Sequence, residues 1–146
     1  MLKKLFVILI LFLSLQSCSN KDIEYEPKDR VDPYQLYKEG YAAFDTGDCF
    51  FANKKFSEAE LNFITVEFAA KASIMSSFSL YGINFYNEAL SNLERYLKKY
   101  PADVNVVYAH YLIAIIHYEQ ISDEKKDLKP LIMADKKINE FLKDYP

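Results

Sequence analysis

One helical pattern occurs three times in this chain of 146 residues, and it constrains the fold more than any other feature. Each copy has a small residue, apolar residues four and seven positions later, and a closing residue twelve positions later. The three copies are Ala52, Phe56, Ala59 and Ile64; Ala89, Leu93, Tyr96 and Pro101; and Ala134, Ile138, Phe141 and Pro146. Apolar residues at steps of three and four share one face of an α-helix. Such repetition predicts an array of similar helical units.

Each copy resembles the second helix of a tetratricopeptide repeat, in which a small residue precedes a large one and proline ends the helix. Apolar spacing predicts six helices, at about 33–45, 50–64, 69–81, 86–99, 105–120 and 130–143. They pair into three repeats, at about 32–64, 65–101 and 102–146. We therefore predict an all-α solenoid of about three helix-turn-helix repeats, in which each pair buries its apolar face on the next. The alternative is a plain helical bundle whose periodicity arises by chance.

Residues 1–17 have the character of a secretory signal peptide. Lys3 and Lys4 precede an apolar run over residues 5–15, which is too short to cross a bilayer as a stable helix. The run ends in Leu15-Gln16-Ser17-Cys18, which resembles the lipobox of bacterial lipoproteins. We expect cleavage before Cys18, which would then carry the lipid. An ordinary secretory signal with a chance cysteine is the alternative.

Lipid on Cys18 would anchor the mature chain, since two or more acyl chains hold a protein stably on a membrane. Ser19 follows the cysteine where an inner-membrane sorting signal would have Asp, so we expect an outer-membrane address. Residues 18–31 are mostly polar and form a tether that reaches at most roughly 45 Å when extended. The repeat domain should therefore begin near residue 32 and stay close to the membrane.

Charge and motifs argue against several classes of function. The formal net charge is −3 and no run of Lys or Arg exceeds two residues, so we expect no nucleic-acid partner. The sequence contains no phosphate-binding loop, nucleophile elbow or H-E-x-x-H motif. His110 and His117 would lie two turns apart, roughly 10 Å along a helix, which is too far to share one metal ion. We expect no enzyme, no metal and no cofactor other than the lipid; a lipid-anchored enzyme would need a polar cluster that the sequence does not offer.

Aromatic residues concentrate on the first helix of each predicted repeat. In a tetratricopeptide array these helices line a concave groove. The inward positions would be Tyr34, Tyr37, Tyr41 and Phe44; Lys71, Ile74, Phe78 and Tyr81; and Tyr108, Tyr111, Ile115 and Tyr118. Nine of these twelve are aromatic, and Tyr offers apolar area with a hydroxyl that stays hydrated. We predict that ten of the twelve, all but Lys71 and Ile115, form a peptide-binding groove; the alternative is that the rings pack between helices as core.

Three stretches resemble the BamD family of outer-membrane lipoproteins. FSEAE at 56–60 is similar to the family's first repeat, ALSNLERYLKKYP at 89–101 to its second, and YAHYLIAIIHYEQ at 108–120 to its third. Two departures stand out. Ile64 replaces the family's usual Pro, so the helix should break near Thr65-Val66. Family members usually have five repeats where this sequence has three, so we expect a further repeat beyond the apolar helix at 130–143.

The resemblance implies a scaffold on the periplasmic face of the outer membrane. Its partners would be BamA, the other subunits of the β-barrel assembly machinery, and unfolded β-barrel outer-membrane proteins, which it would help to recognise and insert. The family's first repeats are associated with the aromatic-rich C-terminal signal of those substrates. The alternative is a different envelope adaptor lipoprotein with tetratricopeptide repeats, serving peptidoglycan or secretion machinery.

Overall fold

The computed structural model describes residues 31–121 and 127–146, and residues 31–146 form one compact unit. The predicted signal peptide, Cys18 and nearly all of the tether lie outside the described residues. The helices are α2 (Pro33–Asp45), α3 (Cys49–Asn62), α4 (Val66–Gly82), α5 (Tyr86–Lys99), α6 (Val106–Glu119) and α7 (Lys129–Asp144). No strand occurs in the described part of the chain. The prediction of an all-α, tetratricopeptide-like fold is confirmed.

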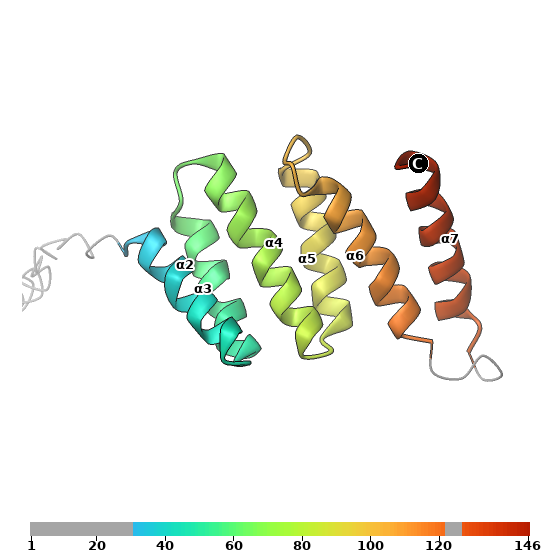
Figure 1. The fold of residues 1–146 in the computed structure, drawn as a ribbon, viewed down its shortest axis with the longest axis horizontal. Coiled ribbons are helices and arrows are strands. Elements are labelled where there is room, and N and C mark those ends of the chain that lie inside the picture. The colour runs from blue at the N-terminus through green and yellow to red at the C-terminus, as the bar shows by residue number, and fades with distance from the viewer. Residues whose placement is uncertain (1–30, 122–126) are drawn as a thin grey trace, which may run out of the picture. The chain divides into compact units, whose positions relative to one another are not determined.

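Each helix packs against the next one along the chain, and neighbouring helices run in alternating directions (Figure 1). The connections α3–α4 and α5–α6 therefore lie at one edge of the array. The connections α2–α3 and α4–α5 lie at the opposite edge. No helix within the described ranges has the length and apolar character needed to span a membrane.

Local signals fix the ends of the first helices. The side chain of Asp32 accepts a hydrogen bond from the Tyr34 backbone N–H at 3.0 Å, which caps α2, and Pro33 occupies its first turn. Asp48 caps α3 in the same way, accepting from the Phe51 N–H at 3.0 Å. Gly47 follows α2 with a φ of 83°, a left-handed conformation that glycine adopts without steric cost. These caps explain why the predicted start of α2 is correct.

The break between α3 and α4 differs from the expectation. Helix α3 ends at Asn62 rather than 64, and α4 begins at Val66 rather than 69. Phe63 adopts an extended backbone, and its ring lies 5.1 Å from that of Tyr34 and 5.5 Å from that of Phe68. The packing of this ring against α2 and α4 therefore ends α3 close to Ile64, the residue that replaces the family's usual proline.

The core follows the repeated pattern. Ala52, Ala89 and Ala134 are almost fully buried, as close helix packing requires. The small residue Gly40 of α2 serves the same purpose, since a Cβ there would lie 3.0 Å from the ring of Phe56. Helix α4 is the most enclosed, with nine buried residues, four of which are serines. Helix α7 has one buried residue.

Candidate peptide-binding groove

A hollow of about 340 Å³ lies between α2, α4 and the start of α6. Its walls are formed by Tyr41, Phe44 and Asp45 of α2; Lys71, Ile74, Met75 and Phe78 of α4; and Asn105 and Tyr108. The hollow is thus lined by the first helices of the three predicted repeats. Five of the ten candidate binding residues meet there: Tyr41, Phe44, Ile74, Phe78 and Tyr108.

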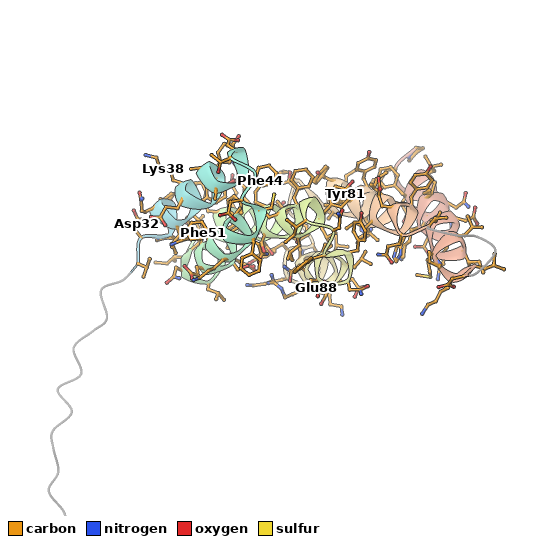
Figure 2. All side chains as sticks on the ribbon, turned by 90° about the horizontal axis from the view of Figure 1, so that it is seen from below. Asp32, Lys38, Phe44, Phe51, Tyr81 and Glu88 are labelled. Carbon is orange, nitrogen blue, oxygen red and sulfur yellow. The ribbon has the colours of Figure 1, made fainter. Side chains whose placement is uncertain are left out.

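Aromatic rings form a continuous ladder across this groove. The ring centroids of Phe44 and Phe78 are 5.4 Å apart, and those of Phe78 and Tyr108 are 6.2 Å apart. Tyr111 extends the ladder at 6.2 Å from Tyr108 and contacts Phe141 of α7 at 5.9 Å. Figure 2 shows the side chains, with Phe44 labelled. Tyr108 and Tyr111 are also exposed, so part of each ring is accessible to a ligand.

Two other candidates on α2 lie apart from the hollow. Tyr34 is exposed, and its ring packs edge-on against Phe63 and Phe68. Tyr37 is half-buried, with its ring 5.2 Å from that of Phe56, and it packs on the small core around Leu36. Burial raises the pKa of Tyr37, with a smaller contribution from Tyr41. Tyr37 is therefore placed to stabilise the fold.

The remaining candidates lie beyond the other end of the hollow. Tyr81 is half-buried and stacks on Phe78 at 6.0 Å. Tyr118 is exposed near the end of α6. Neither residue lines the hollow. The side chains that could engage one ligand together are therefore concentrated around Phe78.

The groove is mainly apolar and nearly neutral. Asp45 and Lys71 are the charged residues on its walls. Burial raises the pKa of Tyr108, so its hydroxyl stays protonated and can donate a hydrogen bond at physiological pH. In the described ranges no three His, Cys, Asp or Glu side chains lie close enough to hold a metal ion. Such a surface suits an apolar or aromatic ligand.

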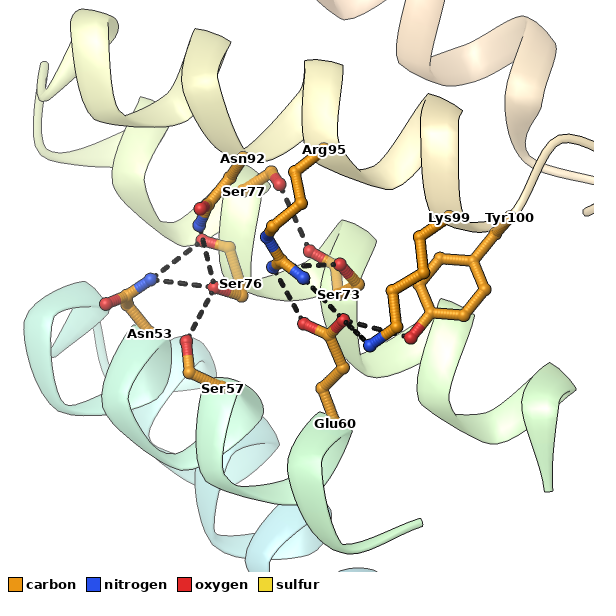
Figure 3. A network of polar contacts seen from close by, with 10 residues as sticks. All are labelled: Asn53, Ser57, Glu60, Ser73, Ser76, Ser77, Asn92, Arg95, Lys99 and Tyr100. Carbon is orange, nitrogen blue, oxygen red and sulfur yellow. Dashed lines mark hydrogen bonds and ion pairs between the residues drawn. The ribbon is translucent and has the colours of Figure 1, made fainter. Parts of the chain in front are cut away.

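An ion cluster around the buried carboxylate of Glu60 ties the first two helix pairs together on another face of α4 (Figure 3). Glu60 of α3 accepts two hydrogen bonds from Arg95 of α5, at 2.6 and 2.8 Å. Lys99 and the hydroxyl of Tyr100 donate to the same carboxylate at 3.0 and 2.9 Å. Burial would raise the pKa of Glu60, but the hydrogen bonds from Arg95, Lys99 and Tyr100 outweigh it and lower this pKa to about 2. The carboxylate is therefore charged at all physiological pH values.

A second polar group lies beside this cluster, centred on Ser76 of α4. Its hydroxyl lies 2.8 Å from the Asn53 amide nitrogen, 3.0 Å from the Ser57 hydroxyl and 3.3 Å from the Asn92 amide nitrogen. These partners come from α3 and α5, so α4 is bonded on both sides. The two polar groups fix the angle at which the first pair of helices meets the second.

The sequence reasoning missed this cluster, although the repeat contains a signal for it. Glu60 stands eight positions after Ala52, whereas Leu97 and Leu142 stand at that position in the other two copies. A charged residue at a position that is otherwise apolar indicates a buried partner. The partner itself could not be identified from the sequence because Arg95 lies 35 residues away.

Successive antiparallel helix pairs around an aromatic-lined groove define a helical-repeat scaffold of the tetratricopeptide type. Residues 29–146 match the family model YfiO, described as an outer membrane lipoprotein. This match covers most of the sequence, and the chain belongs to that family. The predicted resemblance is confirmed, and the family is one of the outer membrane.

Two relatives carry a more specific name. The chain is 27% identical over 145 residues to the outer membrane protein assembly factor BamD of Rickettsia prowazekii, covering 99% of this chain and 57% of that protein. It is 30% identical over 111 residues to the assembly factor BamD of Caulobacter vibrioides, covering 76% of this chain and 36% of that protein. The chain therefore spans about half or less of the length of these relatives.

Proposed function

We propose that this protein is a scaffold of the β-barrel assembly machinery, held on the periplasmic face of the outer membrane by lipid on Cys18. It binds unfolded β-barrel proteins and works with BamA and the other subunits of the machinery. It carries out no chemical step itself. The names of the two relatives and the family description support this assignment.

The observation that carries the proposal is the spacing of the aromatic ladder. Alternate side chains of an extended strand are roughly 6.6 Å apart. The rings of Phe44, Phe78 and Tyr108 follow one another at 5.4 and 6.2 Å. Strands of outer-membrane barrels alternate apolar and polar side chains, with aromatic residues near their ends. An extended segment can therefore place every second, apolar side chain on successive rings of the groove.

Binding of a synthetic peptide tests this function. The peptide should have the alternating pattern and aromatic C-terminus of a barrel strand, and its affinity is measured by fluorescence anisotropy with the purified chain. Tyr41→Ala and Tyr108→Ala each remove a partly exposed ring from the hollow, and each should weaken binding on the order of tenfold. Tyr118→Ala is the matched control, since it removes an exposed tyrosine outside the hollow. Equal affinities for all four proteins would refute the groove.

The anchor and the partners need separate measurements. Mass spectrometry of the chain purified from membranes should find acyl groups on Cys18, and Cys18→Ser should abolish them. Co-purification from detergent-solubilised envelopes should recover BamA. Recovery of peptidoglycan-associated or secretion proteins in its place would favour the alternative, an adaptor of another envelope system.

A further inference from the structure

Four aliphatic side chains are strongly exposed at one edge of the array. Leu61 is 80% exposed, Ile64 90%, Val66 68% and Val104 87%. We call these four residues the aliphatic edge. Single exposed apolar residues are common on soluble proteins, but a cluster of this kind marks a surface that contacts something apolar.

The four residues come from two connections that lie side by side. Leu61 is in the last turn of α3, Ile64 is in the connection that follows, and Val66 is the first residue of α4. Val104 is in the connection between α5 and α6, and together with Val66 it lines a second hollow, separate from the groove and also of about 340 Å³. Figure 1 shows both connections at the same edge of the array. The aliphatic edge is therefore one surface.

This edge is also the one from which the chain continues towards its N-terminus. Tyr34, in the first turn of α2, packs its ring against Phe63 and Phe68, which flank Ile64 and Val66. Val31, three positions earlier, is the first described residue and is itself 49% exposed. Cys18 is thirteen residues before Val31, a span of at most roughly 45 Å. A lipid on Cys18 would thus hold this edge within reach of the bilayer.

We propose that the aliphatic edge inserts into the phospholipid surface of the membrane, at the boundary between headgroups and acyl chains. The proposal rests on the anchored location given in the proposed function. The anchor keeps the edge at a high local concentration next to the bilayer, so that a weak apolar insertion suffices. Insertion would orient the array, with the connections α3–α4 and α5–α6 facing the lipid.

The chemistry of the edge favours acyl chains over other ligands. Within residues 61–68 the one charged residue is Glu67. The hollow shared by Val66 and Val104 adds Asp103 and Lys99, and the ammonium of Lys99 is already paired with Glu60, so the edge offers no cluster of cations to an anionic headgroup. Contact should therefore depend on apolar burial and be insensitive to salt. Protein interfaces concentrate their binding energy in Trp, Tyr and Arg, whereas Leu and Val are under-represented there. A lipid surface fits the composition of the edge better than a protein partner does.

The absence of tryptophan from the sequence allows a direct test. Ile64→Trp places a reporter on the aliphatic edge. Phe50→Trp is the matched control, since Phe50 is 67% exposed in the first turn of α3, about 20 Å from the edge along that helix. The lipidated full-length variants, purified from membranes, are reconstituted into protein-free phosphatidylethanolamine–phosphatidylcholine vesicles with brominated acyl chains. The emission of I64W should shift to the blue and be quenched in both low and high salt, and that of F50W should not.

A second substitution measures the contribution of the edge. Adding Leu61→Asp to I64W should lower the fraction of inserted protein on the order of tenfold, because a buried leucine side chain contributes at least that much to partitioning. Vesicle flotation reports anchoring independently, and the peptide titration reports the groove. A chain that fails to float overturns the anchor and the insertion together. A chain that floats with unquenched I64W, or with both reporters equally quenched, overturns the insertion alone, as does a response that appears only when envelope proteins are present.

Discussion

Helices α3 and α7 carry the same sequence pattern, yet the structure buries them to different extents. Phe56 of α3 is fully buried, whereas its counterpart in α7, Ile138, is half-buried. Four residues later in each helix, burial does not follow polarity. The charged residue Glu60 of α3 is buried, whereas the apolar residue Leu142 of α7 is 59% exposed. A shared pattern thus predicts the helix but not the environment of its outer face.

The difference arises from the neighbouring helices. Helix α3 packs against both α2 and α4, and its Glu60 also bonds to α5. Helix α7 packs against α6. In α3, the pattern residue Phe56 contacts Gly40 of the preceding helix, whereas Glu60, at a position that varies between the copies, bonds to a helix that follows. The following predictions test this division, beginning with the largest effect.

Truncation of the large residue should cost much more in α3 than in α7. Phe56→Ala should lower the free energy of unfolding by about 4 kcal/mol, because it leaves a cavity in a fully enclosed site. Ile138→Ala should cost about 1 to 2 kcal/mol, since the half-buried site has less to lose. Urea denaturation followed by circular dichroism measures both. Similar costs would show that the two helices are equally enclosed in solution.

Neutralising Glu60 should have the next largest effect. Glu60→Gln should lower the free energy of unfolding by about 3 kcal/mol at pH 7, because it removes a charged acceptor from Arg95 and Lys99. Both cations still reach water, with side chains 43% and 48% exposed, which limits the loss. Glu140→Gln, on the surface of α7, is the control and should leave the midpoint unchanged.

The contribution of Glu60 to the free energy of unfolding should depend on pH, and the direction of the dependence follows from its pKa. The folded-state pKa of Glu60 is about 2, below its ordinary value of 4.5. Its contribution is therefore complete above pH 4.5 and is lost as the pH falls towards 2. The difference in unfolding free energy between the wild type and Glu60→Gln should narrow over that window. A difference that stays constant from pH 7 to pH 2 would contradict the charged cluster.

The smallest effects are expected at the counterparts of Glu60. Leu142→Lys should change the free energy of unfolding by less than about 0.5 kcal/mol, because the side chain is exposed. Leu97→Lys should cost about 1 to 2 kcal/mol, because Leu97 packs partly against the main core. Thermal denaturation of the two variants provides the comparison. If Leu142→Lys were as costly as Leu97→Lys, the outer face of α7 would be covered in solution.

The sequence was a good guide to the helices because their signals are local. Asp32 and Pro33 stand directly at the helix start that they fix, and the spacing of small and large residues in each copy predicted the second helices. The boundary at Phe63 was missed by two residues because it depends on rings from α2 and α4 that are distant in sequence. Propensity alone cannot report such tertiary packing.

The groove was partly predictable for the same reason. The spacing along each helix identified the face that carries the aromatic rings, and five of the residues it selected meet in the hollow. The spacing could not distinguish Tyr37, whose ring packs against Phe56, from Tyr41, which lines the hollow one turn later. The distinction depends on the distance between α2 and α4 at each turn of α2. The sequence of a single helix does not contain that information.

Because α4 is more enclosed than α7, the two helices should open at different rates. Nine of its residues are buried, and serine and asparagine side chains bond it to both neighbours, whereas α7 has one buried residue. Amide hydrogens in α4 should exchange with solvent only when the whole domain opens, and those in α7 should exchange through frequent local opening. In this chain, helix α7 can therefore open and close many times while the wall formed by Ile74 and Phe78 keeps its shape.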